Sequence, residues 1–304
     1  MLTLSAGAAG ALAQQSSPPL ALDPSAAGQG TALLIAADES ALSSNGQSAE
    51  SITFALPRGM RVDTVAREQL CAEDQAARSA CPASSQIGFG RFVVAVRGYL
   101  FGGGEAELAW SIDAYLGQPL RRGDTASVVL TGNLLGAASV AALLEPALGT
   151  SVPTTVTTVG RLVRPASGAY GIELRFPTLP VRLEVTAPIT ATPARLELAL
   201  SAVRRIRQNF IRHIRIRTPS GYEVRKIRDH RLIGHYLLRT PRSCNGSWTS
   251  ELRVGFPGTV KRTASPIACS KNGSAGASRS APSTPTAARS RSVTRSGRRA
   301  RATS

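Results

Sequence analysis

The sequence predicts an all-β protein, an antiparallel β-sandwich, on the strength of two observations. Short segments with alternating apolar and polar residues recur from Thr31 to Cys269, separated by Pro- and Gly-rich turns. Such alternation is typical of antiparallel strands with one buried and one solvated face. The four cysteines also form two locally spaced pairs, as in disulfide-stapled domains. We expect one sandwich of roughly ten to thirteen strands, with two stacked modules dividing near residues 145–155 as the alternative.

Individual strands follow from their patterns. The clearest alternating segments are Glu105–Tyr115, Ile172–Phe176, Leu196–Leu200 and Trp248–Phe256. Their charged residues, Glu173 among them, are predicted to lie on solvated faces. Two continuous apolar runs, Phe92–Val96 and Val128–Leu130, predict central strands, because such strands are buried on both sides.

One short helix is predicted after Cys71. Glu73 and Asp74 fall in its first turn and Arg78 in its last, which suits the helix dipole, and Pro82 ends it. A second helical stretch is predicted at Gly136–Leu148, which is rich in Ala and Leu.

The four cysteines, Cys71, Cys81, Cys244 and Cys269, allow three disulfide connectivities. Local pairing is favoured because each local pair brackets one unit. The first pair brackets the short helix, and the second brackets a hairpin of Trp248–Phe256 and Thr259–Ile267 that turns at Pro257-Gly258. Zinc is the rival interpretation, but the spacing lacks the short Cys and His pairs of zinc sites. We therefore predict structural disulfides, with no metal and no cofactor.

The N-terminal residues predict export. Residues 1–13 end in Ala11-Leu12-Ala13, a signal-cleavage pattern, but lack a positive start, so we interpret them as a truncated signal peptide. The alternative that they are no signal stays open. Residues 14–30 are predicted to be a flexible lead-in, 31–269 the body and 270–304 a disordered Arg/Ser-rich tail. No segment approaches the length of an apolar membrane span.

The net charge of +17 is localised. Residues 204–242 hold twelve Arg/Lys against Glu223 and Asp229, and residues 271–304 hold eight Arg/Lys and no acid. The rest of the chain is close to neutral. The basic character therefore belongs to one internal segment and the tail.

The internal basic segment predicts a β-hairpin. Residues 203–217 and 222–239 flank a Thr-Pro-Ser-Gly turn. Ile214 and Ile216 alternate with Arg215 and Arg217, which predicts an apolar inner face and a basic outer face. Candidate polyanion contacts are Arg212, Arg215, Arg217, Arg225, Lys226 and Arg228.

Two interpretations of this hairpin are open. The favoured one is an edge hairpin whose cations prevent edge-to-edge aggregation. The other is a surface for anionic cell-wall polymers or lipid headgroups. Nucleic acid is not expected, because Phe210, Tyr222 and Tyr236 provide few stacking platforms and export would separate the protein from it.

Catalytic signatures are missing from the sequence. It contains no G-x-S-x-G elbow, S-x-x-K motif or P-loop. Glu105, Glu107 and Asp113 share one predicted strand face, and the three histidines are predicted to be solvated: His213, His230 and His235. We expect a structural or binding component of the cell envelope, with a secreted hydrolase as the alternative.

Several segments also resemble one family. LPRGMRVD at residues 56–63, the run from Cys71 to Gly90 and CNGSW at Cys244–Trp248 are similar to secreted β-rich proteins of soil actinobacteria of the Solirubrobacter and Conexibacter type. The resemblance covers about residues 30–270. It implies a signal peptide, Cys71–Cys81 and Cys244–Cys269 bridges and extracytoplasmic residence, and it implies no activity.

Overall fold

A computed structural model describes residues 18–44, 47–98, 105–136, 152–166, 168–181, 183, 189–218 and 221–271. These residues belong to one compact unit and confirm the all-β, antiparallel prediction. Three predictions lie outside the described residues: the signal peptide, the helix after Gly136 and the tail beyond residue 271.

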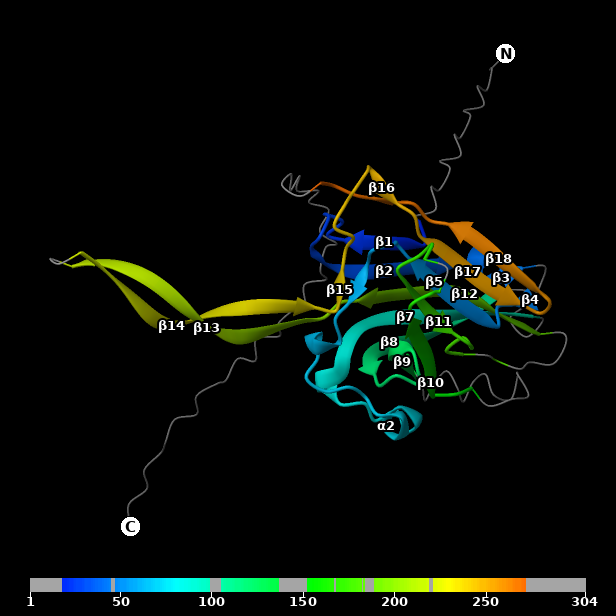
Figure 1. Cartoon of the computed structure of the whole chain (residues 1–304). Helices are drawn as coiled ribbons and strands as arrows, with labels where there is room; N and C mark the ends of the chain where they lie inside the picture. The colour runs from blue at the N-terminus through cyan, green and yellow to red at the C-terminus, as the bar shows by residue number, and fades with distance from the viewer. Residues whose placement is uncertain are drawn as a thin grey trace, which may run out of the picture. The chain divides into compact units, whose positions relative to one another are not determined.

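Thirteen strands form the main sheet, and every pairing in it is antiparallel (Figure 1). Across the sheet the order is β18 (Thr259–Ala264), β17 (Glu251–Phe256), β5 (Ser51–Leu56), β11 (Ile172–Phe176), β10 (Thr155–Val163), β9 (Asp124–Leu134), β8 (Glu105–Gly117), β7 (Gln86–Arg97), β12 (Thr190–Leu200), β2 (Gly30–Asp38), β15 (Leu238–Arg239) and β6 (Arg61–Val62). Strand β1 (Leu20–Asp23) adds to β2. Three two-stranded pairs are separate: β13 (Val203–Thr218) with β14 (Gly221–Tyr236), β16 (Ser247–Trp248) with β19 (Ile267–Ala268), and β3 (Ser43–Ser44) with β4 (Gln47–Ser48).

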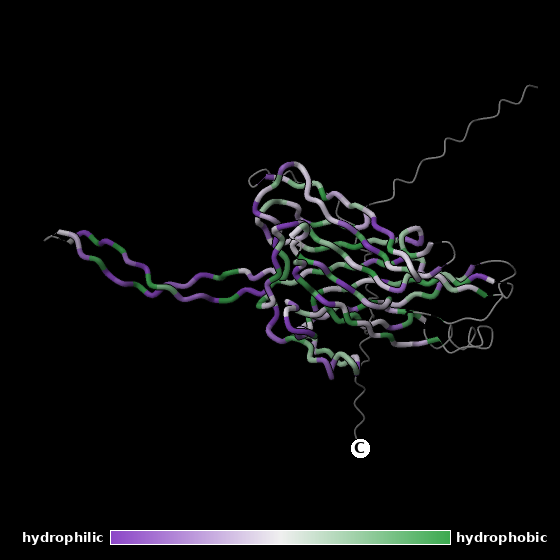
Figure 2. Tube along the Cα trace, turned by 45° about the vertical axis from the view of Figure 1, so that its right-hand side comes forward, coloured by the Kyte–Doolittle hydropathy of each residue, from purple (hydrophilic) through white to green (hydrophobic). Residues whose placement is uncertain are grey.

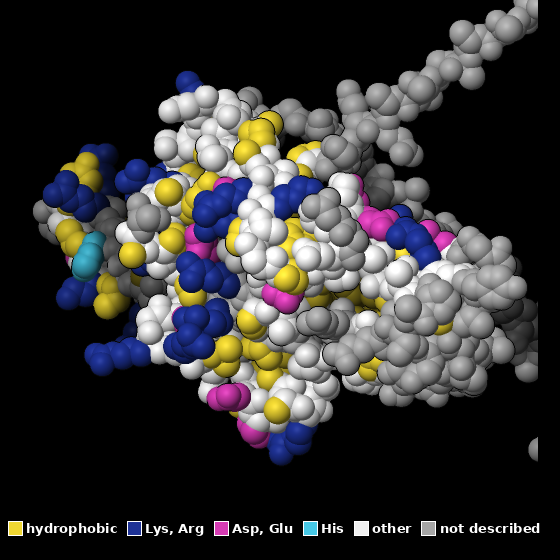
Figure 3. All heavy atoms as spheres, turned by 90° about the vertical axis from the view of Figure 1, so that its right-hand side faces the viewer, with side chains coloured by type: hydrophobic (Ala, Val, Ile, Leu, Met, Phe, Trp, Pro, Cys, Tyr) yellow, Lys and Arg dark blue, Asp and Glu magenta, His cyan; other side chains and the backbone are white. Residues whose placement is uncertain are grey.

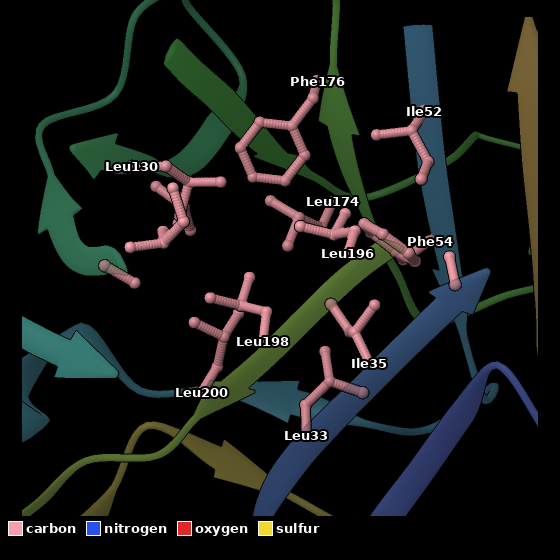
Figure 4. Close-up of a cluster of buried hydrophobic side chains, with 14 of the residues drawn as sticks. Leu33, Ile35, Ile52, Phe54, Leu130, Leu174, Phe176, Leu196, Leu198 and Leu200 are labelled. Atoms are coloured by element: carbon pink, nitrogen blue, oxygen red, sulfur yellow. The ribbon is translucent and has the colours of Figure 1, made fainter. Parts of the chain in front are cut away.

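The main sheet folds over on itself, so that distant strands face each other as the layers of a sandwich. Side chains of β2 and β12, such as Ile35 and Leu198, point toward those of β5, β9 and β11 (Figure 4). Phe54 and Phe176 meet edge to face, with ring centroids 6.5 Å apart. One hydrophobic cluster includes residues before and after the predicted division at 145–155. The strands of the main sheet on both sides of that division therefore share one core.

Strand interiors match the predicted alternation. In β8 the predicted core residues Leu108, Trp110 and Ile112 are buried. Strands β7 and β9, which contain the two continuous apolar runs, each lie between two neighbours in the sheet. The prediction of central strands is confirmed.

The predicted solvated position of Glu173 is wrong. Glu173 in β11 is only 2% exposed, because the side chains of Arg175 and of Arg253 from β17 lie against its carboxylate. Two arginines donate the hydrogen bonds that water would give to an exposed carboxylate. Arg253 Nη1 donates to Glu173 Oε1 at 2.9 Å, and Arg175 donates to Oε2. Pairing of this kind is what a buried carboxylate needs to remain charged.

From residue 20 onward, the prediction of a flexible lead-in over residues 14–30 is wrong. Residues 20–23 form β1, and both Leu20 and Leu22 are buried. Ala26 bridges to Ser270, with Ala27 N donating to the Ser270 carbonyl at 3.1 Å. The prediction is wrong here because four residues between prolines give too short a pattern, and a long-range partner supplies the pairing.

Four short helical turns connect the strands: α1 (Glu39–Leu42), η1 (Thr64–Ala66), α2 (Glu73–Ala77) and η2 (Ala83–Ser85). The helix predicted after Cys71 is α2, whereas α1, capped by the Asp38 side chain, was not predicted. None of the helices in the described part of the chain has the length and apolar character to cross a membrane.

Both predicted disulfides are present. Cys71–Cys81 spans α2, with Cα atoms 5.1 Å apart, and Cys71 N donates to the Leu116 carbonyl at the end of β8. Buried Ala76 holds α2 against Val129 on the outside of the sheet. The bridge therefore fastens a helix too short to be stable alone onto the sandwich.

The second disulfide, Cys244–Cys269, encloses the predicted hairpin of β17 and β18, with Cα atoms 5.9 Å apart. Inside it, β16 pairs with β19, and Trp248 Nε1 donates to the Ser243 carbonyl at 2.8 Å. Because Ser270 bridges to Ala26, this disulfide also secures the contact between the two ends of the body.

Removing either disulfide is expected to destabilise the body by about 3 kcal/mol, because each cross-link restricts the unfolded chain. The variants are Cys71→Ala/Cys81→Ala and Cys244→Ala/Cys269→Ala. Thermal unfolding should show a lower Tm by roughly 6–12 °C for each, given a body of this size. An unchanged Tm in either double variant contradicts a stabilising role for that bridge.

Candidate functional site

The basic segment forms the predicted hairpin. Strands β13 and β14 have sixteen residues each and pair without interruption from Val203–Tyr236 to Thr218–Gly221. They pair with each other and with no strand of the main sheet (Figure 1). The hairpin is therefore a separate two-stranded ribbon, and it is not the edge of the sheet that the favoured sequence interpretation assumed.

The predicted apolar inner face of the hairpin is wrong, since neither face is covered. On the face of Ile214 and Ile216, which was predicted to be the inner one, Phe210 is 38% and Ile227 43% exposed. On the opposite face Ile211 is 60% exposed, Val224 56% and Tyr222 72%. Figure 2 shows hydrophilic and hydrophobic residues alternating along the ribbon. Alternation predicts which residues share a face, but a second layer is needed to bury that face, and the described residues provide none here.

The register divides the hairpin charges unequally between its two faces, because directly opposed residues point to the same side. We call the face of the odd-numbered residues of β13 and the even-numbered residues of β14 the cationic face. It bears six exposed cations and no acid: Arg205, Arg207, Arg215, Arg217, Lys226 and Arg228. The opposite face bears four arginines and both acids: Arg204, Arg212, Arg225, Arg231, Glu223 and Asp229.

The six candidate residues consequently separate into two groups. Four of them lie on the cationic face: Arg215, Arg217, Lys226 and Arg228. They belong to four cross-strand pairs that follow one another on that face. We call these pairs, 211–228, 213–226, 215–224 and 217–222, the distal patch. Candidates Arg212 and Arg225 lie on the other face, where Arg225 contacts Glu223 at 3.3 Å.

Sequence reasoning missed Arg205 and Arg207, which also belong to the cationic face. Once the turn is fixed between Thr218 and Gly221, the pairs can be counted outward from it along both strands. The sequence therefore contains the information that places Arg205 and Arg207 on the cationic face. Arg207 Nη2 lies 3.0 Å from His230 Nδ1 on the same face.

Side-chain contacts tie the base of the hairpin to the body. His235 Nδ1 lies 2.8 Å from Asp63 Oδ2, and Arg204 pairs with Glu68 at 3.4 Å. The Tyr236 ring packs against Gly30, where any Cβ would clash with it. His235 is thus half-buried and bonded, and its predicted solvated position is wrong.

On the body, cations lie among acids instead of forming one patch (Figure 3). Arg161 donates twice to Asp124, and this pairing holds the pKa of that carboxyl below its usual range. Arg97 similarly donates to Glu39 and to Glu105. Local ion pairs of this kind offset the charge of the body, in contrast to the cationic face.

Of the three carboxylates that share one predicted strand face, Glu105 is paired with Arg97, and Asp113 accepts a hydrogen bond from Gln86 at 2.9 Å. The described residues contain no cluster of three or more His, Cys, Asp and Glu side chains suited to a metal ion. A cavity of about 510 Å³ beside α2 is lined by threonines and apolar residues, with Glu73 as an acidic group. These positions bring no acid–base pair together.

Comparison of the chain with family models, curated proteins and solved structures found no match. The functional argument therefore depends on the geometry and chemistry of the described residues. Within that geometry, the cationic face is where unpaired charge is most concentrated.

Proposed function

We propose that this protein is an extracytoplasmic binding protein that attaches to anionic groups of the cell envelope, in surface polymers or lipid headgroups, through the cationic face of its hairpin. The observation that supports the proposal is the division of charge by the register, six exposed cations with no acid on one face. Disulfides form and persist in oxidising compartments outside the cytoplasm, so the two bridges support the extracytoplasmic part of the proposal. The basic tail adds longer-range attraction to the same surfaces.

The spacing of the cations suits a repeating anion. Successive pairs on one face of a ribbon are roughly 7 Å apart, so the distal patch extends over about 20 Å. Each cation held near an anionic surface contributes about 1 kcal/mol, and salt screens that contribution. Arginines without a carboxylate partner on their own face keep this capacity for a ligand.

Neutralising the distal patch is expected to weaken binding strongly. The variant Arg215→Gln/Arg217→Gln/Lys226→Gln/Arg228→Gln should bind polyphosphate about 1,000-fold more weakly than the unaltered chain at low salt, because four contributions of about 1 kcal/mol are lost. The measurement is retention on immobilised polyphosphate over a salt series, and the variant should also show the smaller salt dependence.

A matched control separates local charge from net charge. Arg58→Gln/Arg61→Gln/Arg91→Gln/Arg122→Gln removes the same number of cations from exposed body positions that form no ion pair with described residues. We expect this control to change retention by less than about threefold. Equal losses in the two variants, or no loss in the hairpin variant, would show that the cationic face is not the binding surface.

A further inference from the structure

The distal patch contains exposed apolar side chains as well as cations. Ile211 lies directly across from Arg228, Val224 from Arg215 and Tyr222 from Arg217. Each of these three apolar side chains is more than half exposed. Binding a hydrophilic polyanion would not move these apolar side chains out of water, so they would not contribute to its binding.

We propose that the partner of the distal patch is the surface of an anionic lipid bilayer, on which the arginines bind headgroup phosphates while Ile211, Tyr222 and Val224 enter the boundary of the acyl chains. This inference rests on the proposed function and names its ligand class. A bilayer interface provides anions and hydrocarbon within about 5–10 Å of each other. The alternating cross-strand pairs present both kinds of group at that spacing.

The backbone of the hairpin fixes how deep it can lie. Both edges of a two-stranded ribbon carry unpaired N–H and C=O groups, which hydrocarbon cannot satisfy. The ribbon must therefore lie flat in the headgroup region, with only side chains reaching deeper. Tyr222, beside the turn, is of the side-chain type that prefers this region.

Charge complementarity favours lipid over a second copy of the chain. Two cationic faces would bring together twelve cations and no acid, which disfavours stacking at ordinary salt. An anionic bilayer instead neutralises these charges as the apolar side chains leave water.

The decisive variant removes apolar character and keeps every charge. Ile211→Thr/Tyr222→Thr/Val224→Thr retains β-branched side chains suited to a strand. We expect its partitioning to vesicles of phosphatidylcholine and phosphatidylglycerol to fall by about tenfold or more. Its binding to polyphosphate should stay within about twofold. Vesicles of phosphatidylcholine alone should bind neither chain.

A second measurement does not depend on the folding of that variant. In Tyr222→Trp, the new indole should shift its emission to the blue on anionic vesicles and be quenched by lipids brominated on their acyl chains. Absence of both effects, or vesicle binding by the Thr variant equal to that of the unaltered chain, overturns the lipid inference and leaves polyanion binding intact. If the unaltered chain binds neither vesicles nor polyphosphate, both proposals fail. If light scattering then shows dimers that the Thr variant abolishes, the patch is an interface between copies.

Discussion

Excising residues 203–236 and joining Ala202 to Leu237 through Asn-Gly is expected to leave the body folded and to abolish its hairpin-dependent binding to anionic surfaces. Leu237 N donates to the Ala202 carbonyl at 2.8 Å, so these two residues already face each other at the base of the ribbon. Asn-Gly is the preferred two-residue loop for closing such a pair. Removing the ribbon exposes little core, because its strands pair only with each other.

The excision tests stability and binding separately. It removes the contact of His235 with Asp63, the contact of Arg204 with Glu68 and the packing of the partly exposed Tyr236 ring on Gly30, each worth about 1 kcal/mol or less. Tm should therefore fall by less than roughly 12 °C. Retention on polyphosphate should drop at least as far as in the four-glutamine variant. Collapse of the Tm would instead make the hairpin part of the folding unit, and full retention would move the binding surface to the body or tail.

The sequence was a good guide to the strands and a poor guide to what covers them. The burial of Trp110 and Leu198 follows from local alternation, which fixes the face to which each side chain points. The same alternation in β13 suggested a buried face for Ile214 and Ile216, yet Phe210 on that face is exposed to solvent. Burial depends on a second layer supplied from elsewhere in the chain, and no local pattern contains that information.

The candidate site was partly predictable for the same reason. Clustering of arginine placed it on the hairpin, and the turn between Thr218 and Gly221 fixes the pairing that separates Arg215 from Arg212. Contacts between segments far apart in the chain could not be predicted from the sequence. Asp63 and His235 are 172 residues apart, and nothing around either residue indicates the other.

Loss of the arginine beside buried Glu173 is expected to destabilise the body by about 3–5 kcal/mol, because it leaves a desolvated carboxylate with one cation in place of two. Arg253→Met keeps most of the side-chain volume but removes the donor to Glu173 Oε1, the ion pair with Glu251 and the cation above the Tyr170 ring. Urea unfolding should show a lower midpoint with an unchanged slope, since the surface exposed on unfolding is the same.

Two comparisons assign that cost to the buried charge. Arg195→Met breaks an exposed pair with Glu197 at 3.9 Å and should cost less than about 1 kcal/mol. Glu173→Gln/Arg253→Met removes the carboxylate charge together with its partner, and should be more stable than the sum of the single losses by about 1–3 kcal/mol. If Arg253→Met costs no more than Arg195→Met, or if the two substitutions at Glu173 and Arg253 are additive, the folded sheet does not depend on neutralising this carboxylate. The predicted coupling instead makes Arg253, on a strand far from Glu173 in sequence, the residue that allows a charge to remain inside the sheet.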